Sequence, residues 1–268
     1  QGRIVEDEEL KADLATAKPY EKWLGQAQYK LEDLEALDGH VHEITTDEER
    51  LLKQQQAFGY TQEDITKFLE PMAVNADDPI GSMGTDTPIA VLSRRPRLLF
   101  DYFKQNFAQV TNPPIDPLRE DCVMSLVTQL GKETNIFHAG PETVNHVILN
   151  SPVLSQRKLR ELLKMPQYVE KNRLVDLSYS PEEGLKAGIE RICREVEQAA
   201  RDGVVMLLLS DRYPVPERPM VHALLATGAV HHHLCNTGLR CEVNLIIETG
   251  TARDAHHVAC LLGCGATA

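Results

Sequence analysis

The stretch His231-His232-His233 is the most concentrated set of possible metal ligands in the sequence. The spacing of apolar residues predicts a helix over 219–235, which contains all three histidines. Consecutive residues on a helix are rotated by about 100° from one another, so three sequence neighbours cannot converge on one ion. A metal site needs convergent ligands, and the tract therefore does not favour one.

A second set, His257, Cys260 and Cys264, has better spacing, because i, i+3 and i+7 share one face of a helix. These residues could bind a structural zinc ion if a fourth ligand came from elsewhere. Gly263 interrupts the helix, however, and cysteine is often a small buried apolar residue. We therefore favour core packing for this set over zinc binding.

The sequence contains no nucleophile elbow, no HExxH, no P-loop and no dinucleotide-binding glycine motif. Asp211 and Glu248 follow predicted strands, which is where βα-barrel enzymes place functional groups. Neither has an obvious catalytic partner in the sequence. We assign no catalytic, cofactor-binding or metal-binding residue from these patterns, and we expect the isolated segment not to be catalytic.

Composition excludes several classes of protein. The 268 residues carry a net charge of −12, and the only basic cluster is Ser93-Arg94-Arg95-Pro96-Arg97, which argues against nucleic-acid binding. No apolar run approaches the ~18 residues of a membrane span. The six cysteines are scattered, as expected in a reducing cytoplasm. The first residue is Gln1 and not Met, which suggests a processed chain or a piece of a longer one.

The first part of the chain, residues 1–172, is predicted to be helical and rich in loops. Thr46 with Glu49, and Thr61 with Asp64, have the spacing of helix caps. These caps predict helices near 47–57 and 62–70, and Pro71 should end the second. A short buried strand is expected at 89–92. A helix is expected over 98–109, with Leu99, Phe103 and Phe107 on one face, and Asp116 with Pro117 should open another helix.

The second part, residues 173–268, alternates strands and helices. Strands are expected at 174–179, 204–209 and 242–247, and helices after the Ser180-Pro181-Glu182-Glu183 capping box, over 219–235 and over 254–262. The first of these helices should bury Leu185, Ile189, Ile192 and Val196. This βαβαβα order predicts an α/β fold with a parallel sheet. A further strand is expected where the sequence reads 263–268.

Several strings in the sequence match one family. The longest is Phe107-Ala108-Gln109-Val110-Thr111-Asn112-Pro113-Pro114-Ile115-Asp116-Pro117-Leu118-Arg119-Glu120. Others are 81–93, 101–105, 209–212, 228–231, 248–257 and 262–268. With these strings the whole chain, residues 1–268, resembles the central domain of glutamate synthase large subunits. The Ala252-Arg253-Asp254 form resembles the bacterial NADPH-dependent type.

The resemblance implies a cytoplasmic multidomain oxidoreductase. In such a polypeptide the central domain lies between a glutaminase domain and an FMN-binding (β/α)8 synthase domain that carries an iron–sulfur cluster. Ammonia from glutamine passes through a tunnel to 2-oxoglutarate, and a small subunit oxidises NADPH. The central domain would be a rudimentary relative of the FMN barrel. Because the nucleophile, FMN and cluster residues belong to the flanking domains, no cofactor is expected in this segment.

Only positions at the domain junction or the tunnel are carried over from the resemblance. They are Ser82, Thr85, Asp86, Thr87 and Asn112, which lie in the irregular stretches 81–88 and 111–117. Their small polar groups could bond passing ammonia or a closing loop, or the stretches could merely seal the junction. The alternative of a different class is a stand-alone βα-barrel-like enzyme or flavin-binding module.

Overall fold

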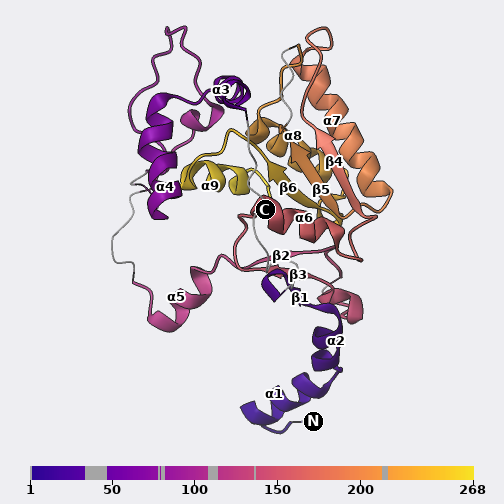
Figure 1. Ribbon diagram of the computed structural model, residues 1–268. Coiled ribbons are helices and arrows are strands. Elements are labelled where there is room, and N and C mark those ends of the chain that lie inside the picture. The colour runs from indigo at the N-terminus through magenta and orange to yellow at the C-terminus, as the bar shows by residue number, and fades with distance from the viewer. Residues whose placement is uncertain are drawn as a thin grey trace.

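The computed structural model describes residues 2–33, 47–77, 79, 82–107, 114–135, 137–212 and 217–268. Three parallel strands form its central sheet in the order β4-β5-β6. The strands are β4 (Asn172–Asp176), β5 (Met206–Ser210) and β6 (Asn244–Glu248), and the helices that follow them are α7 (Gly184–Arg201), α8 (Ala223–Asn236) and α9 (Ala255–Gly263). The βαβαβα order and the parallel sheet are confirmed (Figure 1).

The sheet is buried on both faces, as the continuous apolar run of β5 predicts. On one face Leu207 and Leu209 pack in a core with the inner sides of α7, α8 and α9. On the other face Met206 and Leu208 pack against α6 (Gln156–Lys164) and a second sheet. That sheet has the order β1-β3-β2, with β1 (Tyr29–Lys30), β2 (Thr128–Leu130) and β3 (Val147–Leu149). The sheet β1-β3-β2 and helix α6 therefore cover the second face.

The last residues of the chain continue the central sheet beyond β6. Thr267 donates its backbone N–H to Leu245 O at 2.7 Å, and Ile247 donates to Ala268 O at 2.9 Å. Arg240 ties this segment down, because its Nη2 donates to Gly265 O at 2.9 Å. The position is the one where the sequence predicts a further strand.

Helix α7 begins later than predicted. Residues 181–183 form a turn that Gly184 closes by donating to Ser180 O at 3.1 Å, and Gly184 has φ +78°. Glu183 does not complete a capping box, since its carboxylate accepts a hydrogen bond from Arg191. Ile192 is buried as predicted, whereas Leu185 is 43% exposed and does not belong to the buried face. The rest of the predicted face keeps its phase, because Val196 is buried and Ile189 packs against the core.

The helices of the first part are α1 (Asp7–Thr16), α2 (Tyr20–Ala27), α3 (Glu48–Ala57), α4 (Glu70–Asn75) and α5 (Pro117–Val123), with a π-helical turn η3 (Asp64–Leu69) that runs into α4. Asp47 caps α3, and Thr46 lies outside the described residues. The reciprocal Thr61–Asp64 cap is confirmed. Pro71 does not end a helix. It lies in the first turn of α4, where proline is tolerated because no intrahelical N–H bond is required.

Two predicted elements are wrong. Residues 89–92 form no strand: Val91 and Leu92 lie at a turn and are 88% and 95% exposed. Of the helix predicted over 98–109, residues 108 and 109 lie outside the described residues, and the rest forms the 3₁₀ turn η4 (Leu99–Tyr102), which buries Phe100. Phe103 and Phe107 of the predicted stripe are exposed. The chain leaves the helical path because Gln105 N–H bonds Met83 O at 2.9 Å, so a tertiary contact replaces the next turn. Short 3₁₀ turns also occur at η1 (Leu31–Asp33), η5 (Pro141–Val144) and η6 (Arg240–Glu242).

Candidate functional site

The predicted junction residues Ser82, Thr85, Asp86 and Thr87 lie together in one exposed loop. The loop is organised locally, because the Ser82 hydroxyl donates to Gly84 O and the Thr85 hydroxyl accepts from Thr87 N–H. The fifth residue, Asn112, lies outside the described residues, as do 111 and 113. The structure therefore brings four of the five candidates together and does not place the last.

This loop, residues 82–87, is held against the segment 103–105. Besides the backbone bond from Gln105 to Met83, Lys104 Nζ lies 3.2 Å from Asp86 Oδ1. Gly84 has φ +89°, and a Cβ at this position would lie 2.5 Å from Phe103 O. Only glycine allows both the backbone conformation and the close approach. The loop thus presents exposed hydroxyl groups from a fixed base.

The carboxyl ends of β5 and β6 carry the polar groups that the sequence singles out. Glu248 accepts hydrogen bonds from the Ser210 hydroxyl at 2.7 Å and from Arg212 Nη1 at 2.7 Å. Arg212 also donates to Gln156 at the start of α6, at 3.2 Å. Through Arg212, the Glu248 carboxylate therefore links the ends of β5 and β6 to α6, which packs on the second face of the sheet.

Asp211 is 2% exposed and organises the loop that follows β6. Its carboxylate accepts from the Thr249 hydroxyl at 2.6 Å and from Gly250 N–H at 2.9 Å. Burial raises the pKa of Asp211 above its ordinary value, against these two hydrogen bonds, which lower it. Sequence reasoning found Asp211 and Glu248 but missed their partners, because these are hydroxyl and amide groups with no motif spacing.

The loop organised by Asp211 leads to Arg253, which is the centre of a polar contact between distant segments. Arg253 Nη1 donates to Asp64 Oδ2 at 2.8 Å, and Nη2 donates to Phe58 O at 2.7 Å. The guanidinium lies 4.0 Å from the centre of the Tyr60 ring. Tyr60 in turn donates its hydroxyl to Gly250 O at 2.8 Å. Arg253 thereby attaches α3 and η3 to the α/β core.

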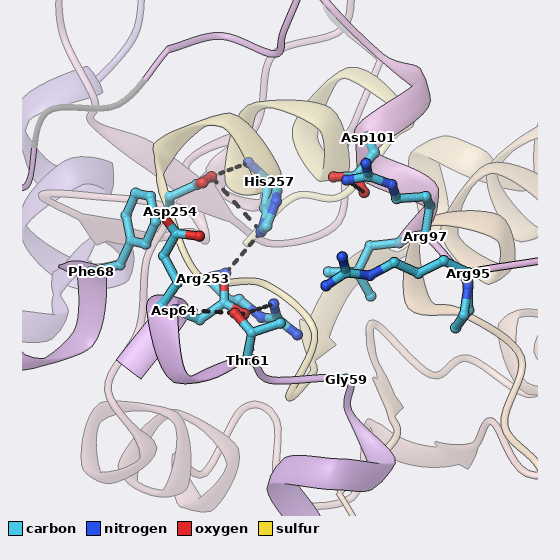
Figure 2. Close-up of a pocket in the computed structure, with 13 residues that line it drawn as sticks. Gly59, Thr61, Asp64, Phe68, Arg95, Arg97, Asp101, Arg253, Asp254 and His257 are labelled. Carbon is cyan, nitrogen blue, oxygen red and sulfur yellow. Dashed lines mark hydrogen bonds and ion pairs between the residues drawn. The ribbon is translucent and has the colours of Figure 1, made fainter. Parts of the chain in front are cut away.

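A cleft of about 400 Å³ lies beside this contact. One wall carries Asp64, Arg253 and His257, and the other is formed by 95–101 with Arg95 and Arg97 (Figure 2). Glu63, Asp101 and Asp254 also line it. The basic cluster at 93–97 is the only signal in the sequence that points to this cleft, and it could not show that residues of η3, of the turn before it and of α9 lie opposite.

The structure gives the partners of the histidine and cysteine residues that the sequence singles out. His231 accepts from Arg240 Nε at 3.1 Å, whereas His233 lies 2.7 Å from Glu197, so neighbours in the tract have different partners. Cys260 and Cys264 are free thiols that pack against the core of the central sheet. In the part of the chain that the structure describes, no three His, Cys, Asp or Glu side chains are grouped as metal ligands.

None of the helices formed by the described residues has the length and hydropathy that crossing a membrane requires. What the loop 82–87 and the cleft can bind depends on their exposed side chains. Those side chains are hydroxyls in the loop 82–87 and charged groups in the cleft, and both can bind polar ligands or another polypeptide surface.

Comparison with known proteins gives a consistent result. The family model described as "Glutamate synthase central domain" matches residues 53–268. The chain is 44% identical to "Ferredoxin-dependent glutamate synthase 2, chloroplastic" of Arabidopsis thaliana, over 100% of the chain and 16% of that protein. It is 42% identical to "Glutamate synthase [NADPH] large chain" of Bacillus subtilis, over 100% of the chain and 17% of that protein. It is 39% identical to "Glutamate synthase [NADH]" of Schizosaccharomyces pombe, over 100% of the chain and 13% of that protein. The chain thus spans about one sixth of the first two relatives and less of the third.

Proposed function

The chain belongs to the family of glutamate synthase central domains, and from this premise we propose that it links a glutaminase domain to an FMN-binding synthase domain and helps to form an ammonia tunnel. The whole polypeptide would make L-glutamate from L-glutamine and 2-oxoglutarate with NADPH, which a small partner subunit oxidises. Residues 1–268 would act as one central domain in the cytoplasm, with a helical part to 172 and a βαβαβα part after it.

The cofactors of such an enzyme are FMN and an iron–sulfur cluster, and we assign both to the flanking domains. The cysteines of this chain do not fit a cluster, because they do not gather among the described residues. FMN and the cluster would supply electron transfer to the imine formed in the synthase domain. The central sheet would be a reduced relative of that domain's barrel. Its β4-β5-β6 unit supports this proposal, since barrels are built from the same parallel βα repeat.

The observation that carries the linking role is the distribution of exposed apolar side chains. Large apolar residues of the first part are widely exposed, and the most exposed are Leu92, Ile4, Val91, Leu118 and Phe137. Apolar surface of this extent on a folded domain marks contact with another polypeptide surface. The relatives are about six times longer than this chain, so the rest of the same polypeptide is the natural partner.

The loop 82–87 is the part of this surface best suited to line a passage. Its hydroxyl groups are exposed, and its base is fixed by the segment 103–105. A passage for ammonia needs small polar groups that accept and donate hydrogen bonds without trapping a cation. Ser82, Thr85 and Thr87 supply such groups, and Asp86 is engaged by Lys104.

The test is a bulky substitution in the full-length enzyme. Thr87→Phe should leave glutaminase turnover running while the glutamate formed per glutamine hydrolysed falls, and synthesis from added ammonia should survive. Thr66→Phe, at another exposed threonine, is the matched control and should keep the coupling ratio. If Thr87→Phe keeps its coupling ratio and only loses stability, the loop seals the junction and does not line the tunnel.

A further inference from the structure

Arg95 lines the cleft together with Arg97 and Arg253 and differs from them in its partners. Arg253 is paired with Asp64 at 2.8 Å, and Arg97 lies 3.9 Å from Asp101. Among the described residues no carboxylate pairs with Arg95. Figure 2 shows its side chain extending into the cleft toward the wall that carries Arg253 and His257. In a chain of net charge −12, an arginine aimed into a cleft without a carboxylate partner needs a physical reason.

The opposite wall presents a hydrogen-bond donor. His257 Nδ1 accepts from Arg253 N–H at 3.0 Å, so the proton of the neutral ring is on Nε2. Burial lowers the pKa of His257 and keeps the ring neutral, although Asp254 opposes this. Phe100 stacks on the ring at 4.3 Å and fixes its orientation. The ring is therefore a positioned N–H donor and adds no charge of its own.

The acidic groups of the cleft are largely engaged. Asp64 accepts from Arg253 and from both the N–H and the hydroxyl of Thr61. Asp254 accepts from His257 N–H and caps α9. Asp101 has Arg97 close by, and Glu63 lies at the edge with its side chain exposed to solvent. The positive charge of Arg95 is therefore the one that a ligand in the cleft would meet first.

We propose that this cleft binds a carboxylate group, held by Arg95 with Arg97 beside it. The planar guanidinium fork matches a carboxylate in two parallel hydrogen bonds. Arg97 is 3.9 Å from Asp101, beyond hydrogen-bond distance, so it can turn to a second carboxylate oxygen. The carboxylate comes either from a small free acid, which a cleft of about 400 Å³ admits, or from an acidic side chain of the polypeptide outside this chain. The site is independent of the proposed tunnel.

The first arm of the test titrates the chain with succinate and follows the NMR signals of Arg95 and His257. Succinate should bind saturably, and its uncharged diamide should not. Arg95→Gln should weaken succinate binding at least tenfold, through loss of a charge-assisted pair. Arg94→Gln is the matched control, because Arg94 is exposed and outside the cleft, and it should change the affinity less than twofold. Arg95→Lys should fall between the two.

The second arm decides whether the carboxylate comes from the longer polypeptide. Phenylglyoxal, which modifies accessible arginines, should label Arg95 and Arg94 equally in this chain. In the full-length protein Arg95 should be protected and Arg94 should still react. Since Arg95 is exposed and none of the described residues pairs with it, Arg95→Gln should unfold at the same denaturant concentration as the parent. The proposal is overturned if succinate binding falls equally in Arg94→Gln and Arg95→Gln, or if succinate does not bind and Arg95 is labelled equally in both proteins.

Discussion

Replacing Arg253 should detach α3 and η3 from the α/β core while leaving the core folded. The side chain is 6% exposed and joins Asp64, Phe58 O and the Tyr60 ring. Arg253→Met keeps most of its length and apolar stem but removes the guanidinium. The change removes the partly buried hydrogen bonds that Arg253 donates to the Asp64 carboxylate and to the Phe58 carbonyl.

The cost can be worked from these contacts. Breaking a buried ion pair from one side costs about 3–5 kcal/mol. Asp64 is 20% exposed and keeps its two hydrogen bonds from Thr61, so both features reduce the penalty. We therefore expect about 2–3 kcal/mol for the local contact. This corresponds to about a 30- to 150-fold larger population of the detached state.

Amide hydrogen exchange measures the opening of each segment separately. Exchange in α3 should accelerate by about the same 30- to 150-fold, while amides of β5 in the central sheet should exchange as before. Arg201→Met is the control, because Arg201 forms an exposed i,i+4 pair with Glu197 and should cost under about 1 kcal/mol.

A double-mutant cycle of Arg253→Met with Asp64→Asn should show a coupling of about 1–3 kcal/mol. The reasoning is refuted if α3 exchanges no faster in Arg253→Met than in Arg201→Met. It is also refuted if all segments accelerate together, because Arg253 would then stabilise the whole fold and not one attachment.

Three further outcomes are expected. Ile192→Ala should lower the unfolding free energy by about 2–4 kcal/mol, because it loses buried apolar surface and leaves a cavity. Lys186→Ala should lower it by less than about 0.5 kcal/mol. Equal denaturation midpoints for the two variants would show that the phase of α7 is wrong. Burial alone would raise the pKa of Asp64, but the contacts with Thr61 and Arg253 outweigh burial and lower that pKa. Protection of the α3 amides from exchange should therefore be full above about pH 4 and fall as the pH drops through the lowered pKa. In Asp64→Asn this pH dependence should disappear. Elemental analysis should find well below one zinc per chain, and a full equivalent lost on Cys260→Ser would contradict core packing for that cysteine.

The sequence predicts the central sheet well because its signals are local and agree with one another. The apolar run around β5 and the Asp254 cap of α9 each point to the element that forms. The cap spacing misplaces the start of α7 for a specific reason. Ser180 and Glu183 have the spacing of a capping box, but Gly184 closes a turn first, and Glu183 is engaged by Arg191 from two turns further along the helix.

The first part was predicted less well because its elements depend on contacts between distant residues. The periodicity of Leu99, Phe103 and Phe107 predicts a helix, yet Gln105 bonds Met83 and the helix ends after one turn. The two- and three-residue strands of the second sheet are too short to give a periodic signal. Arg253 has no motif, and its partners are almost 200 positions away, so sequence spacing could not reveal the attachment it makes.

At the carboxyl edge of the sheet, the usual reaction centre of βα proteins, neighbouring groups already engage both carboxylates. Glu248 is bound by Ser210 and Arg212, and Asp211 is buried under Thr249 and Gly250. Each carboxylate thus holds neighbouring elements together, and a substrate would have to break those bonds to reach it. Gly250 and Arg253 lie in the segment that follows β6, and their hydrogen bonds attach α3 and η3 to this edge of the sheet. It acts as a joint, and the exposed polar groups proposed to meet other molecules lie elsewhere, in the loop 82–87 and at Arg95.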